Sequence, residues 1–468
     1  MVPFFPQQIA NRALLTYGVS VALVSMVFFS HSMSLMYIAL GFVFVAGFFN
    51  LTSVWSVRWK RMNEAQFTKI LFGLALGLRL VWVVASYYYY IETTGTEFDK
   101  DARDATGYHY QASWFYYLPW EEIFDRCFGA KAVGISDAGY PLYLTMIYKM
   151  FGIHVMVPRI IKAFIGAWTA VLIYKISART FEESTGRMAG LMCALMPNMI
   201  IYCGYHLKEI EMIFLEVAFL ERMDYLLRIR KYNFLNIMVP ILLAGILFFF
   251  RTVLGLAAVF AFATSTLFSV SPTMRRGWKR TAIIGWSVLA LVLATGGTAV
   301  TEVEELWENK SSNVERKRME QTGQGNQWAH YATGTVMAPM IVALPFSTMI
   351  DVEGQENQMT KHGGNFVRNF MAFFAILAIY EAIRQKKWRN FALIGSFTIA
   401  YLGVISISGF SNSERFLLPG LAGLIPMWAY GVSQLNAKNY RMIHYWFYVV
   451  VVMEVGWAYF KLGSRGLF

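Results

Sequence analysis

The sequence predicts an all-α protein that crosses a membrane many times. Of its 468 residues, 57% are hydrophobic and only 15% are charged, whereas about a quarter of a soluble chain is charged. Apolar runs recur along the chain, and each is long enough to cross the ~30 Å hydrocarbon layer, which takes ~20 residues in a helix. Three cysteines in a chain of this length exclude a disulfide-stabilised scaffold.

About thirteen runs are expected to be transmembrane helices. In order they lie near 14–30, 34–55, 70–91, 156–179, 188–205, 209–227, 235–250, 252–270, 281–300, 366–385, 391–410, 416–433 and 443–462. The first is not read as a cleavable signal peptide, because a second run follows at once. The apolar stretch 335–350 is predicted to be a re-entrant or surface element, since a span there would reverse every later loop. A true span at 335–350 remains the alternative.

The basic residues in short loops predict the orientation. They occupy alternate connections: Arg58, Lys60, Arg61 and Lys69; Arg179 and Arg187; Arg228, Arg230 and Lys231; Arg275, Arg276, Lys279 and Arg280; Arg384, Lys386, Lys387 and Arg389; Lys438 and Arg441. A cytoplasmic N-terminus places them all inside. The long connections 92–155 and 301–365 are then outside and hold eighteen of the 29 acidic residues. The net charge of +12 thus reflects topology and indicates no nucleic-acid partner.

Four regions follow from this layout. Residues 1–65 form an N-terminal transmembrane hairpin, and 66–300 form a transmembrane core that includes the first outer loop, 92–155. Residues 301–365 form the second outer loop, and 366–468 the C-terminal transmembrane helices. The expected location is a bacterial cytoplasmic (inner) membrane. The predicted fold class is therefore an all-α polytopic membrane protein with short surface helices in two large outer loops.

The residues most able to support chemistry lie at the predicted outer ends of the spans. They are Asp104, Tyr108 and His109 in the first loop; Lys208, Glu209 and Glu211 after the span 188–205; Arg251; and Glu414 with Arg415. A carboxylate can deprotonate an acceptor hydroxyl as a general base. Arginine and lysine can hold a phosphate and stabilise charge that develops on it. A second carboxylate can help bind a divalent cation.

Other chemistry-bearing residues are expected to be structural. Arg79 and Glu216 lie deepest in the predicted spans, and we interpret both as contacts between helices. The histidines outside the membrane lack the spacing of a zinc site. Cys127, Cys193 and Cys203 are expected to be unpaired, and a Cys127–Cys203 disulfide at the outer face is the alternative.

Several of these stretches together resemble the GT-C class of membrane glycosyltransferases. The run Asp104-Ala-Thr-Gly-Tyr108-His109 is similar to the acidic motif in the first outer loop of that class. LRLVWVV (78–84), YPLYLTMIYKMFG, LMPNMIIYCGYHLKEIEMIF and SERFLLPG follow the order of further class motifs. The nearest branches are the polyprenyl-phosphate-sugar-dependent protein mannosyltransferases and lipid aminoarabinose transferases. The resemblance covers 70–250 and, more loosely, 366–433; the hairpin 1–65 looks like an addition.

Two departures from the class pattern stand out. Many members carry an Asp-Glu pair where this chain has Asp104-Ala105. The sequence also continues into no large soluble C-terminal domain, which disfavours the oligosaccharyltransferase branch.

The resemblance implies transfer of a sugar from a polyprenyl-phosphate-linked donor to a lipid, glycan or protein acceptor at the outer membrane face. Its implied roles are: Asp104 as base, Glu209 as second acid, Lys208, Arg251 and Arg415 as donor-phosphate ligands, and Tyr108, His109 and Glu211 lining the sugar or acceptor. A divalent cation, Mg or Mn, at Asp104 and Glu209 is the implied cofactor. No Gly-rich nucleotide motif is present.

Two other functions remain open. An O-antigen-type polymerase or ligase would depend on Arg251 and Arg415 but not on Asp104. A transporter or flippase of lipid-linked sugars would need paired halves or broken helices with buried charges, and the sequence shows no such symmetry.

Overall fold

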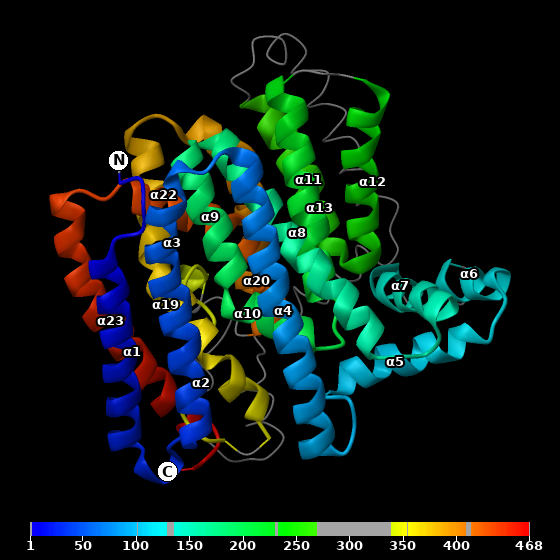
Figure 1. Cartoon of the computed structure of the whole chain (residues 1–468), viewed down its shortest axis with the longest axis horizontal. Helices are drawn as coiled ribbons and strands as arrows, with labels where there is room; N and C mark the ends of the chain where they lie inside the picture. The colour runs from blue at the N-terminus through cyan, green and yellow to red at the C-terminus, as the bar shows by residue number, and fades with distance from the viewer. Residues whose placement is uncertain are drawn as a thin grey trace.

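A computed structural model shows a bundle of helices (Figure 1), and it describes residues 2–100, 102–128, 135–229, 233–268, 338–352, 354–408 and 413–467. Over these residues the regular structure is helical, and no β-strand is formed. An isolated β-bridge joins Ser32 to Ile350. The all-α fold class is therefore confirmed for the described part of the chain.

Seven helical stretches in this part are long and apolar enough to cross a membrane. They are α1 (Gln7–Val27); the continuous stretch Leu35–Arg61, made of α2 (Leu35–Ala46), η2 (Gly47–Leu51), α3 (Thr52–Arg58) and η3 (Trp59–Arg61); α4 (Glu64–Thr94); α8 (Met156–Thr180); α19 (Glu356–Arg384); the stretch Trp388–Ile407, made of η7 (Trp388–Phe391) and α20 (Ala392–Ile407); and α23 (Ala437–Gly463). Each overlaps one predicted span.

The predicted count of thirteen spans is not confirmed. Five further predictions correspond to shorter or more highly charged helices: α9 (Glu183–Leu195) with α10 (Pro197–Ile201) and η4 (Tyr202–Gly204), α11 (Glu209–Ile229), α12 (Phe234–Phe250), α13 (Thr252–Leu267) and α22 (Leu421–Ser433). The remaining one, 281–300, lies outside the described residues. The span 188–205 is interrupted because Pro197 forces Met196 into an extended conformation and then starts α10.

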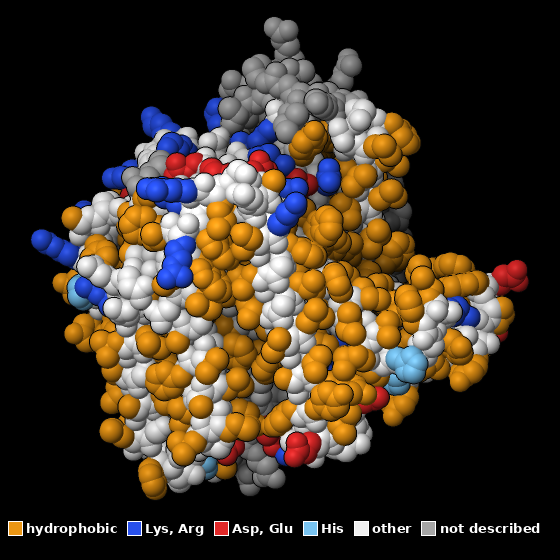
Figure 2. Space-filling model, viewed as in Figure 1, with side chains coloured by type: hydrophobic (Ala, Val, Ile, Leu, Met, Phe, Trp, Pro, Cys, Tyr) orange, Lys and Arg blue, Asp and Glu red, His pale blue; other side chains and the backbone are white. Residues whose placement is uncertain are grey.

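Basic loops gather at one end of the bundle. Arg187 donates hydrogen bonds to the carbonyls of Trp59 and Met62, and Arg228 donates to the carbonyl of Asn390. These bonds hold together connections that are far apart in the sequence, and Lys and Arg side chains cluster along this edge in Figure 2. The alternate loops that the sequence assigns to one side therefore meet at one end. That this end faces the cytoplasm stays a prediction.

Three helices of the first long connection form an arm that projects from the bundle (Figure 1). They are α5 (Arg103–Tyr116), α6 (Trp120–Phe128) and α7 (Ile135–Phe151). Helix α7 packs against α5 and against α12. Exposed aromatic side chains, among them Trp114, Tyr117 and Trp120, cover the arm, as is typical of segments at a membrane–water boundary. Helices therefore occur where the sequence predicts the acidic motif and a surface helix.

The segment after residue 337 is mostly not helical, and it is buried from Ala343 to Ile350. It contains η6 (Ala338–Met340) and continues without regular structure through Ile350. The Asn369 amide donates to the carbonyls of Ala343 and Pro345, and the Ser347 N–H donates to the Glu454 carboxylate at 3.1 Å. Irregular backbone is tolerated within a membrane bundle when protein groups satisfy it in this way.

The two deeply placed charges differ in their surroundings. Arg79 is fully buried and donates to the carbonyls of Cys193 and Ala194, which joins α4 to α9. Its interpretation as a contact between helices agrees with this geometry. Both carboxylate oxygens of Glu216 are buried without a hydrogen-bond partner among the described residues, so the interpretation of Glu216 as a contact between helices stays a prediction.

All three cysteines are free. Cys127 and Cys203 do not form the disulfide that was the alternative.

Candidate active site

Three predicted site residues come together: the carboxylates of Asp104 and Glu209 both contact the guanidinium group of Arg415. Arg415 belongs to the short helix α21 (Glu414–Leu417). Its Nε donates to Glu209 Oε1 at 2.8 Å, and its Nη1 donates to Asp104 Oδ2. Asp104 lies in the first turn of α5 and Glu209 begins α11. Residues separated by more than two hundred positions thus converge, as the catalytic interpretation requires.

The two carboxylates occupy different environments. The Asp104 side chain is 60% exposed, whereas that of Glu209 is 0% exposed and that of Arg415 is 25% exposed. Burial lowers the pKa of Arg415, but the Glu209 and Asp104 carboxylates outweigh this and raise it above its ordinary value. The second oxygen of Glu209 has no hydrogen-bond partner among the described residues. The group therefore presents an accessible carboxylate beside a permanently charged, partly buried cation.

Lys208 and Arg251 lie next to this group. Lys208 Nζ donates to the carbonyl of Phe250 at 2.8 Å and lies 5.9 Å from the centre of the Tyr108 ring. Arg251 follows Phe250 and stacks 4.3 Å from the ring of Phe416, the residue after Arg415. Tyr108 is one helical turn after Asp104. The predicted phosphate ligands and Tyr108 thus border the Asp104–Arg415–Glu209 group.

His109 and Glu211 belong to a neighbouring buried network. His109 Nδ1 and His206 Nε2 both contact the Tyr148 hydroxyl, at 2.9 Å and 3.1 Å. Glu211 lies 3.7 Å from Lys162, which donates to the carbonyl of Tyr205 at 2.8 Å. These contacts connect α5, α7, α8 and α11. That His109 and Glu211 line a sugar or acceptor site stays a prediction.

The structure adds a second group that the sequence did not predict. The Glu414 carboxylate lies 3.0 Å from Lys361 Nζ and accepts a hydrogen bond from the Asn198 amide at 2.6 Å. Arg368, about two turns further along α19, donates to the carbonyl of Leu417. The sequence does contain a pattern that indicates these residues, because polar side chains recur at helical spacing at Lys361, Asn365, Arg368 and Asn369. This second group fixes α21, the helix that carries Arg415.

Asp99 anchors the end of the first loop to α19. Its carboxylate accepts a hydrogen bond from the Asn357 amide at 2.5 Å. Burial raises the pKa of Asp99, while the bond from Asn357 and the charge of Lys361 act in the opposite direction. Because Asp99 and Asp104 flank the same turn, this bond helps position the start of α5.

The described residues do not fit a divalent cation at Asp104 and Glu209 while Arg415 bridges them. The guanidinium supplies the positive charge that a cation would supply between the two carboxylates. In the part of the chain that the structure describes, no three His, Cys, Asp or Glu side chains are grouped so as to hold a metal ion. The predicted Mg or Mn site stays a prediction, and no step of the proposed reaction depends on it.

Acidification is expected to destabilise the protein through His206. Burial, together with Lys162, Arg159 and His109, lowers the pKa of His206 well below its ordinary value of 6.5. The unfolded chain therefore binds a proton as the pH falls through about 6.5 while the folded chain does not, so stability decreases below that pH. Thermal unfolding of the purified protein between pH 7.5 and pH 5 measures this slope.

The control for the pH experiment is a matched pair of variants. His206→Gln should flatten the pH dependence, whereas His154→Gln, which changes an exposed histidine, should leave it as in the wild type. Equal slopes for the wild type and His206→Gln would contradict the assignment to His206.

Comparisons with known proteins place this geometry in context. No protein-family model and no curated protein sequence matches the chain. Among solved structures, it is similar to the archaeal oligosaccharyltransferase AglB from Archaeoglobus fulgidus in complex with an inhibitory peptide and a dolichol-phosphate, with 13% identity and a TM-score of 0.49 over 85% of this chain and 56% of that one. It is also similar to the Archaeoglobus fulgidus oligosaccharyltransferase tethered with an acceptor peptide, with 14% identity and a TM-score of 0.47 over 86% and 56%.

Those neighbours are GT-C class membrane glycosyltransferases, the class that the sequence motifs resemble. Both come from the oligosaccharyltransferase branch, which the sequence disfavours, and this chain spans just over half of their length. At TM-scores below 0.5 neither structure decides the activity of this chain, which is inferred instead from the geometry of its site.

Proposed function

We propose that this protein is a membrane glycosyltransferase that moves a sugar from a polyprenyl-phosphate-linked donor to an acceptor hydroxyl or amine. The observation that carries the proposal is the convergence of Asp104 and Glu209 on Arg415, with Lys208 and Arg251 beside them. This arrangement combines an accessible carboxylate with a cluster of cations. A base for the acceptor and an electrostatic site for a departing phosphate are the two elements that such a reaction needs.

The proposed reaction proceeds by displacement at the sugar. The acceptor oxygen or nitrogen attacks the anomeric carbon, and Asp104 takes the acceptor proton. The bond from the anomeric carbon to the phosphate oxygen breaks, and the electron pair leaves with the polyprenyl phosphate. A guanidinium has five N–H donors, of which the two carboxylates use two. The other donors of Arg415, together with Lys208 and Arg251, can then stabilise the negative charge on the phosphate.

Glu209 has a positioning role in this proposal. Its buried carboxylate fixes the Nε edge of Arg415, so that the opposite edge of the guanidinium faces Asp104 and the phosphate. Glu414, held by Lys361 and Asn198, fixes α21 itself. The acceptor, whether lipid, glycan or protein, would approach from the side of the exposed Asp104. We place this side at the outer face of an inner membrane, in keeping with the distribution of basic loops.

The direct test uses the full-length protein in liposomes with a radiolabelled polyprenyl-phosphate sugar. Covalent transfer to added lipid, glycan or peptide acceptors would support the proposal. Movement of the intact labelled lipid between leaflets without transfer would instead favour the flippase.

Arg251→Gln is expected to weaken donor binding. A charge-assisted hydrogen bond to phosphate contributes about 1.5–3 kcal/mol, so the KM for the donor should rise by about tenfold to hundredfold. The kcat should fall by a smaller factor than the KM rises, because Arg251 borders the cluster whereas Arg415 lies at its centre. Steady-state kinetics over a range of donor concentrations measure both quantities.

Tyr401→Phe provides the matched control for Arg251→Gln. It removes the hydroxyl to which Arg251 donates at 3.2 Å but retains the cation, so its effect on the donor KM should be several-fold smaller. An unchanged donor KM in Arg251→Gln would remove Arg251 from the proposed phosphate site.

A further inference from the structure

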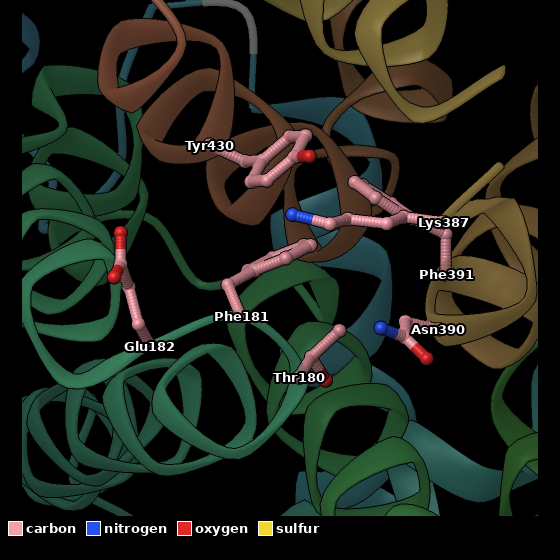
Figure 3. Close-up of a pocket in the computed structure, with 7 residues that line it drawn as sticks. All are labelled: Thr180, Phe181, Glu182, Lys387, Asn390, Phe391 and Tyr430. Carbon is pink, nitrogen blue, oxygen red and sulfur yellow. The ribbon is translucent and has the colours of Figure 1, made fainter. Parts of the chain in front are cut away.

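A small polar pocket lies at the opposite end of the bundle from Arg415. It has a volume of about 110 Å³ and is lined by Thr180, Phe181, Glu182, Lys387, Asn390, Phe391 and Tyr430 (Figure 3). These residues come from the α8–α9 turn, the connection after α19, and α22. The pocket therefore lies among the basic loops, at the end that the sequence assigns to the cytoplasm.

The polar groups of this pocket are arranged around a gap. Lys387 and Glu182 line it without forming an ion pair or a side-chain hydrogen bond with any described residue. In Figure 3 the Lys387 ammonium extends toward the rings of Phe181 and Tyr430, while Glu182 lies at the far edge. Tyr430 is 4% exposed, and its hydroxyl is buried without a hydrogen-bond partner among the described residues. In Figure 3 the Tyr430 hydroxyl is directed toward Lys387 and Phe391.

The turn that carries Lys387 has a defined structure. Lys386 adopts a left-handed conformation, with φ of 56°. The N–H of Lys387 bonds to the carbonyl of Ala382, and the N–H of Lys386 to that of Ile383. This pair of bonds is the Schellman motif that ends a helix. The backbone at Lys387 is thus fixed by the end of α19.

An apolar groove adjoins the pocket. Its volume is about 430 Å³, and it is lined by α20 from Ala392 to Gly403 together with parts of α13, α19 and α22. Phe391 lines both the pocket and the groove. The groove follows α20 for about 16 Å at 1.5 Å per residue. Ile399, which is 69% exposed, lies on its open side, so the groove opens toward the surrounding lipid.

We propose that this pocket and groove bind one glycerophospholipid with a zwitterionic phosphate-plus-amine head group. Lys387 and the Asn390 amide would bind the phosphate, and Glu182, at the far edge of the pocket, would bind the ammonium. Lysine is a common phosphate ligand, and a carboxylate accepts charge-assisted hydrogen bonds from an ammonium. One acyl chain lies in the groove along α20. Opposite charges held apart on the two sides of the pocket match a zwitterion and match neither a neutral nor a purely anionic head group.

The test uses the purified full-length protein, stripped of lipid and titrated with phosphatidylethanolamine or phosphatidylglycerol under native mass spectrometry. The wild type should bind phosphatidylethanolamine several-fold more tightly than phosphatidylglycerol. Lys387→Gln should weaken the binding of both lipids about tenfold, because each loses a charged phosphate contact. Glu182→Gln should weaken only phosphatidylethanolamine and so remove the preference.

Lys386→Gln is the matched control, because it removes the same charge from the neighbouring exposed residue, which does not line the pocket. It should bind both lipids as the wild type does. Equal affinity of the wild type for the two head groups, or equal losses in Lys386→Gln and Lys387→Gln, would overturn the proposal.

A second pair of variants tests the groove independently of the head group. A side chain added at Gly403 would meet open space, and so would one at Gly245 on α12. Gly403→Phe should fill the groove and weaken both lipids about tenfold, whereas Gly245→Phe should change neither affinity. Wild-type affinities in Gly403→Phe would exclude the groove as the acyl-chain site.

Discussion

Asp104→Asn is expected to abolish sugar transfer while leaving a folded protein in the membrane. Asparagine cannot accept the proton of the acceptor, and loss of a general base costs about 10²–10⁴-fold in rate. The fold should survive because the Asp104 side chain is 60% exposed, and an exposed ion pair contributes at most ~1 kcal/mol to stability. Initial rates of transfer, with thermal unfolding of the same preparation, measure the two effects.

Asp125→Asn is the matched control for Asp104→Asn. Asp125 is an exposed acid on α6 of the same arm, so this variant should retain wild-type rates. The polymerase or ligase alternative predicts that Asp104→Asn stays active while variants of Arg251 and Arg415 fail. Undiminished transfer by Asp104→Asn would therefore refute the proposed base and favour that alternative.

Arg415→Met should lose both activity and stability. It removes the cation that lies between Asp104 and Glu209, and it leaves the Glu209 carboxylate buried without its partner. Breaking a buried ion pair from one side costs about 3–5 kcal/mol, and the lower end applies because Arg415 is 25% exposed. Transfer should become undetectable, because the departing phosphate also loses its central ligand.

A second variant separates the two effects of Arg415→Met. In Arg415→Met/Glu209→Gln the buried charge is gone, so thermal stability should recover most of the loss while transfer should remain absent. Arg126→Met, which breaks the exposed Arg126–Glu122 pair on α6, should change neither quantity. Recovery of transfer in the double variant would show that Arg415 serves only to neutralise Glu209.

The sequence prediction agrees with the structure for seven helical stretches, because an apolar run of about twenty residues has few alternatives to a membrane helix. It also identifies Asp104, Glu209 and Arg415 as individual candidates. What it cannot reveal is their contact, since Asp104 and Arg415 are 311 positions apart. That contact depends on how α5, α11 and α21 are placed by the whole bundle.

The differences from prediction have local physical causes. Helix α19 begins at Glu356, ten residues before its predicted span, because a charged residue such as Lys361 finds a partner, Glu414, inside the bundle. A hydropathy pattern assigns such residues to a loop. Conversely, Pro197 interrupts a run that hydropathy reads as continuous.

The N-terminal hairpin has a consequence for the biogenesis of the protein. Helix α1 is made long before α19, yet its Tyr17 hydroxyl donates to His362 Nε2 at 2.6 Å, across 345 positions. The ring can accept this bond because His362 Nδ1 contacts the carbonyl of Met359. At ~5–20 residues per second, the ribosome needs roughly 20–70 s to reach that histidine. During this interval Tyr17 must find another partner in the translocation machinery or in the bilayer, so α1 is inserted well before the helix that gives Tyr17 its final partner.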